Sequence, residues 1–254
     1  MSDIFSIIST KVASDPRLRS VIKKINAGTA TFYDTAYFAD VYSGITGNVF
    51  GANVLDLSVE DREAVCIALL QNNHSEINDI CAQVQGIIDD AAGIHIRAQK
   101  AVFPRERVIQ LAHSLIDPTV ADSVIKRRAT TGVKNVSESF HDDYIKVNAK
   151  FRNDAGFTVY IDRKTDGNCC EWCNQIAGRY VYGTEPDDVY RRHDNCDCTV
   201  TYVNGKKRQD VWSKRSWESP KIGAGAANPT RLTAIQAAEK EQQNLPKIQY
   251  GASQ

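Results

Sequence analysis

Residues 168–198 read NCCEWCNQIAGRYVYGTEPDDVYRRHDNCDC, and this stretch sets the fold of the C-terminal part of the chain. It contains a C-x2-C element and, after an intervening loop, an H-x2-C-x-C element. Thiolates in a C-x2-C turn can reach the same ion, and a second element across a loop completes a tetrahedral shell. The candidate ligands are Cys170, Cys173, His193, Cys196 and Cys198, with Cys169 as a further candidate. We expect four of them to bind one structural zinc ion.

Zinc suits this sulfur-rich ligand set, and iron is the alternative metal. We favour Cys170, Cys173 and Cys198 together with either Cys196 or His193. If His193 is not a ligand, its ring N–H can support a coordinated sulfur or a nearby carboxylate. A reduced, metal-free cluster packed as apolar matter is the competing interpretation. If the metal is present, its removal is expected to unfold residues 157–203 and to spare the helical region, because metal-binding energy becomes folding energy.

Helical spacing of apolar residues dominates the chain up to residue 152. The clearest helix is expected from Val133 to Phe151, where apolar residues recur at steps of three and four. Its other face carries mixed charges, including Glu138 and Asp142, which predicts a solvated surface. Gly156 then provides a stop. The glycines expected to break an earlier, aromatic-rich helix are Gly44, Gly47 and Gly51.

Beyond Gly156 the period changes, because Phe157, Val159 and Ile161 alternate with polar residues as in a strand. A second alternating run over 198–203 is followed by Asn204-Gly205, a turn signal that predicts a hairpin. The sequence therefore predicts an α+β protein in three parts. These are a mostly helical region over 1–152, a small zinc-stabilised α+β module with short strands over 153–208, and an extended tail over 209–254.

The tail is sparse in apolar residues, with a short helix expected over 229–243. Its exposed tryptophans, Trp212 and Trp217, are expected either to anchor a partner or to cover the small module. Basic residues interleave with them and suggest a nucleic-acid-binding surface as one interpretation. These residues are Lys206, Lys207, Arg208, Lys214 and Arg215.

The composition excludes several classes of protein. The chain has 31 basic and 31 acidic residues, so no whole-chain field attracts nucleic acid or acidic lipid. The N-terminus does not have the pattern of a secretory signal, and no apolar run has membrane-spanning length. We therefore expect a soluble protein made in the cytosol, without membrane contact. In that reducing compartment Cys66 and Cys81, which lie within a helical pattern, are expected to be core residues.

Catalytic interpretations are weaker than the structural one. Zinc deaminases place H-x-E before C-x-x-C, whereas here the C-x2-C element comes first. A shell closed by four protein ligands has no open position for a substrate. The alternative is a metal-dependent nuclease, hydrolase or toxin-like enzyme in which His193 and Asp194 act as acid or base. Arg191 and Arg192 could contact phosphate, but the neighbouring acidic residues favour a solvated pair.

The run from Phe151 to Cys198 resembles the minor head proteins of tailed bacteriophages, in the head-morphogenesis family that includes the phage Mu F protein. The resemblance covers the cysteine module and about the last third of the helical region. Asp194 stands where many members carry proline, which bears on the turn before Cys196. The positions that match the family pattern are Cys170, Cys173, Gly178, His193, Cys196 and Cys198.

This resemblance implies a non-enzymatic structural protein of the virion, present in few copies near the portal. It implies a role in head morphogenesis and in DNA packaging or ejection. Its partners would be other phage head proteins, namely the portal or the major capsid protein, and viral DNA is a further candidate. The protein would reside in the phage head, and in the host cytoplasm during assembly.

Overall fold

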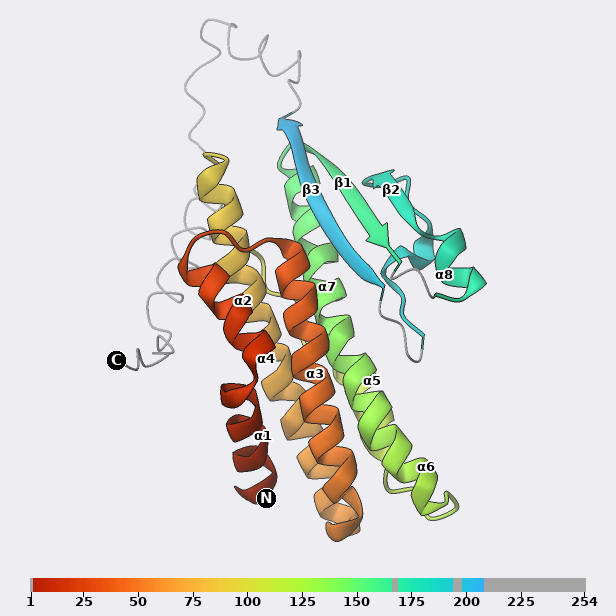
Figure 1. The fold of residues 1–254 in the computed structure, drawn as a ribbon. Coiled ribbons are helices and arrows are strands. Elements are labelled where there is room, and N and C mark those ends of the chain that lie inside the picture. Colours follow the sequence, from red (N-terminus) through yellow and green to blue (C-terminus); the bar gives the residue numbers. More distant parts are fainter. Residues whose placement is uncertain (1, 166–168, 194–197, 208–254) are drawn as a thin grey trace, which may run out of the picture. The chain divides into compact units, whose positions relative to one another are not determined.

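The computed structural model describes residues 2–165, 169–193 and 198–207, and this part of the chain has an α+β fold (Figure 1). These residues belong to one compact unit, Met1–Arg208. Cys196, Asp194 and the tail with its expected helix and tryptophans lie outside the described residues. Of the interleaved basic residues, Lys206 and Lys207 belong to the last strand, and Arg208, Lys214 and Arg215 lie outside the described residues.

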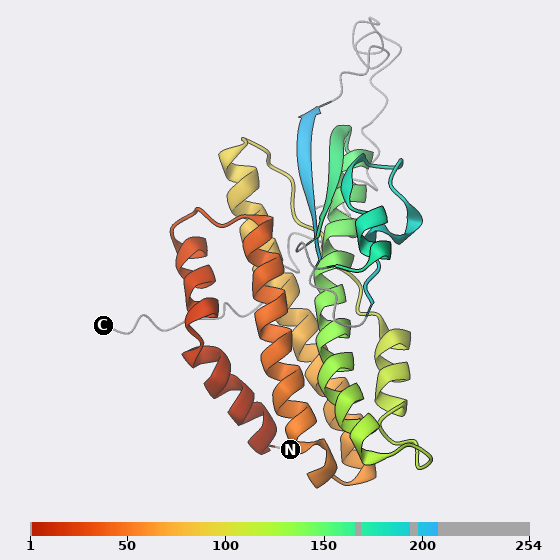
Figure 2. The same cartoon turned by 45° about the vertical axis from the view of Figure 1, so that its right-hand side comes forward.

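Long helices form most of the fold, and α3, α4 and α7 lie side by side in both views (Figures 1 and 2). The helices are α1 (Ser2–Ser14), α2 (Pro16–Asn26), α3 (Phe32–Asn53), α4 (Val59–Ala91), α5 (Arg105–His113), α6 (Asp122–Arg127), α7 (Val133–Asp154) and α8 (Glu171–Gln175). Short turns of helix are η1 (Val54–Asp56), the π-helical turn η2 (Arg128–Gly132) and η3 (Asp187–Tyr190). Ser58 caps α4 by accepting a hydrogen bond from the N–H of Asp61 at 3.1 Å.

The glycines of α3 do not break the helix, so that prediction was wrong. Helix α3 continues through all three glycines. Two of them, Gly47 and Gly51, lie against η2, and this packing contact stabilises the helical conformation there. A Cβ atom at Gly47 would collide with the carbonyl oxygen of Thr130, and one at Gly51 would collide with the Thr130 side chain. The missing side chains therefore permit close approach of two helices, which outweighs the low helix propensity of glycine.

Helix α7 follows the predicted apolar stripe, and Gly156 ends it with a positive φ of 91°. The prediction of a solvated polar face was wrong at two positions. Glu138 and Asp142 are 2% and 1% exposed, respectively. The physical reason is that α7 packs against α3, α4 and the sheet, so more than one of its faces is covered.

Three antiparallel strands in the order β2-β1-β3 form the sheet: β1 (Phe157–Lys164), β2 (Gly178–Val181) and β3 (Thr199–Lys207). Ile161 pairs with Tyr180 of β2 and Tyr202 of β3. The buried side chains of β1 and β3 belong to the same apolar core as those of the helices. The sheet is therefore a layer on the helices, with α7 contacting both β1 and β3.

The hairpin expected at Asn204-Gly205 is not formed, because both residues lie inside β3. The register shifts there: Val159 pairs with Asn204, and Phe157 pairs with Lys207. Two residues of β3 thus oppose Thr158 alone, which is the arrangement of a β-bulge. A Cβ atom on Gly205 would lie 3.0 Å from the carbonyl oxygen of Thr158, so glycine serves this bulge rather than a turn.

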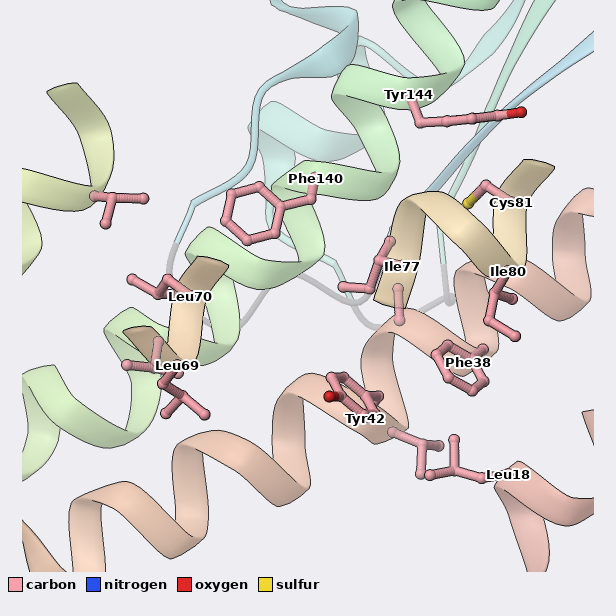
Figure 3. Close-up of a cluster of buried hydrophobic side chains, with 14 of the residues drawn as sticks. Leu18, Phe38, Tyr42, Leu69, Leu70, Ile77, Ile80, Cys81, Phe140 and Tyr144 are labelled. Atoms are coloured by element: carbon pink, nitrogen blue, oxygen red, sulfur yellow. The ribbon is translucent and has the colours of Figure 1, made fainter. Parts of the chain in front are cut away.

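The core between the helices is continuous, and Figure 3 shows part of it, including Leu18 from α2, Phe38 from α3 and Ile77 from α4. Cys66 and Cys81 are both fully buried there, which confirms their prediction as core residues. Burial raises the pKa of the Cys66 thiol to about 12. Within the described ranges, no helix combines the length and the apolar character needed to cross a membrane.

Candidate metal centre

The C-x2-C element is built on the start of a short helix. Cys170 is the extended residue that precedes α8, and Cys173 lies in the first turn of that helix. This turn brings both sulfurs to one side of the chain. The pKa of the Cys170 thiol is lowered, first by the backbone N–H of Cys173 and then by the Cys173 thiol and the His193 ring. A lowered thiol pKa favours the thiolate, which is the form that binds metals.

His193 completes a group of three ligand atoms. Its Nε2 lies 3.1 Å from the Sγ atom of Cys170 and 3.0 Å from that of Cys173. All three atoms lie within 4.8 Å of one another. The rings of Trp172 and His193 pack edge to face, with centroids 5.7 Å apart. Cys170, Cys173 and His193 can therefore hold a metal ion between them.

The other candidate ligands have different outcomes. Cys198 is 2% exposed and packs with Cys173 in a small buried cluster, which Cys169 and Trp172 border. This cluster is separate from the main core. Among the described residues, the group whose ligand atoms all lie close together contains Cys170, Cys173 and His193. Cys198 therefore lies beside the group, and Cys196 is outside the described residues.

Sequence reasoning missed Arg163, which joins the two halves of the site. This arginine is 1% exposed, and its Nη1 donates to the carbonyl oxygens of Val189 at 2.5 Å and Arg191 at 3.0 Å. Its Nη2 lies 3.8 Å from the Sγ atom of Cys173. The signal was present in the alternation of β1, because Arg163 continues the inward series of Val159 and Ile161.

Arg192 is not the solvated residue that was expected, although Arg191 is exposed and pairs with Asp188 at 2.8 Å. The Arg192 side chain is 9% exposed and contacts two carboxylates of α7. Its Nη1 lies 3.2 Å from Glu138, and its Nη2 lies 3.0 Å from Asp142. The residue immediately before the candidate ligand His193 is thus anchored to the helical bundle.

The two carboxyl groups respond differently to this shared arginine. Burial raises the pKa of Glu138 to about 7, although the charges of Arg192 and Lys134 oppose the rise. Burial also pushes the pKa of Asp142 upward, but Arg192 and His141 outweigh it, so that pKa lies below its usual value. Asp142 therefore carries the negative charge that pairs with Arg192 at neutral pH.

Comparison with known proteins adds no relative: no family model, curated protein or solved structure matches the chain. The chemistry of the site is therefore argued from its own residues. Two sulfurs and one imidazole nitrogen favour a borderline-soft metal ion over calcium or magnesium, which prefer oxygen ligands.

Proposed function

We propose that this chain is a structural minor head protein of a tailed bacteriophage, whose C-terminal module is held by one zinc ion. The observation that carries the proposal is the meeting of Cys170, Cys173 and His193 at one point. Their order along the chain, after a helical region, resembles the head-morphogenesis family. The proposed partners are the portal or the major capsid protein, with viral DNA as a further candidate.

The ligand chemistry supports zinc. Thiolate and imidazole are the usual ligands of structural zinc, and a buried thiol such as Cys198 stands close enough in the fold to join them. Cys196 is the other candidate for the remaining position. In the described ranges the ligand group consists of two cysteines and one histidine, the ligand types of structural zinc sites. That composition supports a structural ion rather than a hydrolytic one.

Metal content tests the centre directly. Purified full-length protein is expected to contain about one zinc ion per chain by elemental mass spectrometry. Cys170→Ser with Cys173→Ser removes two ligands and should abolish that content. Cys66→Ala is the matched control, because it removes a buried thiol of the helical core and should retain the zinc. Equal zinc content in all three proteins would contradict the assignment of these ligands.

Particle residence tests the biological role. Quantitative mass spectrometry would be applied to nuclease-treated phage particles and precursor heads from the producing host. A few copies per head are expected for a portal-associated component. Absence from both kinds of particle would leave the metal centre standing and would overturn the head-protein proposal.

A further inference from the structure

We infer that Arg163 and Arg192 are positioning residues for the metal centre. Together they hold residues 189–193 between the sheet and α7, so that His193 faces the two sulfurs. This inference rests on the proposed metal centre, and it concerns how the fold builds that centre.

Arg163 supplies the link from the sheet. One terminal nitrogen of its guanidinium bonds the backbone on the His193 side, through the carbonyl oxygens of Val189 and Arg191. The other terminal nitrogen approaches the Cys173 sulfur. A single rigid fork therefore fixes the distance between the histidine segment and the C-x2-C turn. Its positive charge also compensates a thiolate in a site where Cys173 is fully buried.

Arg192 supplies the link to the helices. Its guanidinium bonds Asp142 through both Nε and Nη2, and it contacts Glu138 one helical turn earlier. Both carboxyl groups are buried, so the contact is shielded from solvent, and the charged Asp142 holds Arg192 through two bonds. His193 follows Arg192 directly in the chain.

The two anchors act on successive residues. Arg163 holds the carbonyl group of Arg191, α7 holds the side chain of Arg192, and the next residue is the ligand. The backbone that leads into His193 is thus held at both preceding residues, and the imidazole lies beside the two sulfurs without an ion. Preorganisation of this kind increases affinity because less ordering is required on binding.

The test uses the full chain and compares Arg163→Lys and Arg192→Lys with wild type. Lysine keeps the charge but cannot reproduce the forked contacts. Arg179→Lys is the matched control, because Arg179 makes a two-pronged ion pair with Asp162 of the same sheet, at 2.6 Å for each bond. Zinc affinity is measured by competition with a chromophoric chelator. The absorption spectrum of the Co²⁺-substituted protein reports ligand geometry, and circular dichroism reports folding.

We expect both positioning variants to lose about ten-fold or more in zinc affinity and to change the Co²⁺ spectrum, whereas Arg179→Lys matches wild type. If wild type itself binds no zinc, the proposed centre fails. If wild type binds zinc and all three variants match it in affinity and spectrum, the centre stands and the positioning role is overturned. Should Arg163→Lys not fold, the result for Arg192→Lys decides by the same measures.

Discussion

At Glu138, burial and pairing act in opposite directions on a single carboxyl group. Arg192 and Lys134 lie at 3.2 and 3.3 Å, which favours the charged form, while Asp40 and desolvation favour the neutral form. Desolvation wins, and the pKa rises from 4.5 to about 7. The folded state therefore holds a proton on Glu138 at pH values where the unfolded chain has lost it.

This shift predicts a pH-dependent effect of Glu138→Gln. Because proton binding to the native state favours folding, wild type loses stability as pH rises from about 5 to about 8, and the variant lacks this contribution. The free energy of unfolding of the variant minus that of wild type should increase by roughly 2 kcal/mol over that range. Urea denaturation at saturating Zn²⁺ measures it. Parallel pH curves for the two proteins would contradict the raised pKa.

Single residues differed in how well their roles could be predicted. Ligand candidates were visible because chelation imposes a local spacing, and Cys170, Cys173 and His193 do meet. Arg192 was misjudged because its partners lie on α7, 50 residues away from it at Asp142. A local sequence window shows the acidic neighbours of Arg192 but not the carboxylates that a folded helix brings to it.

At the scale of elements, α3 and the π-helical turn η2 show how a glycine can act within a helix. Gly47 and Gly51 contact η2 closely, whereas nothing lies within 4 Å of a Cβ atom built on Gly44. The three glycines therefore share a helix but differ in what surrounds them.

Alanine substitutions should separate the two situations. Gly44→Ala adds helix propensity without a collision, so it should raise the free energy of unfolding by up to about 1 kcal/mol. Gly47→Ala forces α3 away from the Thr130 carbonyl group, so it should lower that free energy by about 1–3 kcal/mol. Chemical denaturation of both variants provides the measurement. Stabilisation by Gly47→Ala would show that the two helices are not in close contact.

The apolar periodicity of the sequence predicted the presence of the helices better than it predicted their ends or the elements that pack against them. Helix α7 follows its apolar stripe, because burial of one face at a spacing of 3.6 residues is a strong constraint. A second face of α7 is covered by β1, β3 and residues 189–192. The sequence of α7 alone contains no signal that predicts these contacts. Asn204-Gly205 was misread for a related reason, because the pairing partner of β3 is β1 and the glycine serves a bulge between them.

For the whole compact unit, a buried ion pair joins helices and sheet. Arg152 of α7 pairs with Asp89 of α4, and its Nε donates to the hydroxyl oxygen of Tyr202 in β3 at 2.8 Å. Burial raises the pKa of Asp89, against the opposing charge of Arg152. The sheet also shares the apolar core of the helices. The boundary expected at residue 152 thus falls inside α7, and the apolar core continues from the helices into β1 and β3.

This shared core predicts that metal removal affects the helices as well as the sheet. Hydrogen exchange of the full chain, followed by mass spectrometry, should show similar protection for β1 and for the centre of α7 when zinc is bound. Addition of EDTA should reduce protection of both by a similar factor. If β1 exchanged freely while α7 kept its protection, residues 157–203 would be a separately folding module, as the sequence had suggested.

The contact of Arg192 with Asp142 also has a consequence for the order of events during synthesis. Helix α7 leaves the ribosome before Arg192, because Asp142 precedes Arg192 by 50 positions in the chain. In a bundle that folds during synthesis, Arg192 could not cover Glu138 and Asp142 until residues 189–193 emerge. When residues 189–193 pack against α7, they cover Glu138 and Asp142 and bring His193 to the two cysteines in the same step. In that order of events, covering of the two buried carboxyl groups and approach of His193 to the cysteines would be a single late event in the synthesis of the chain.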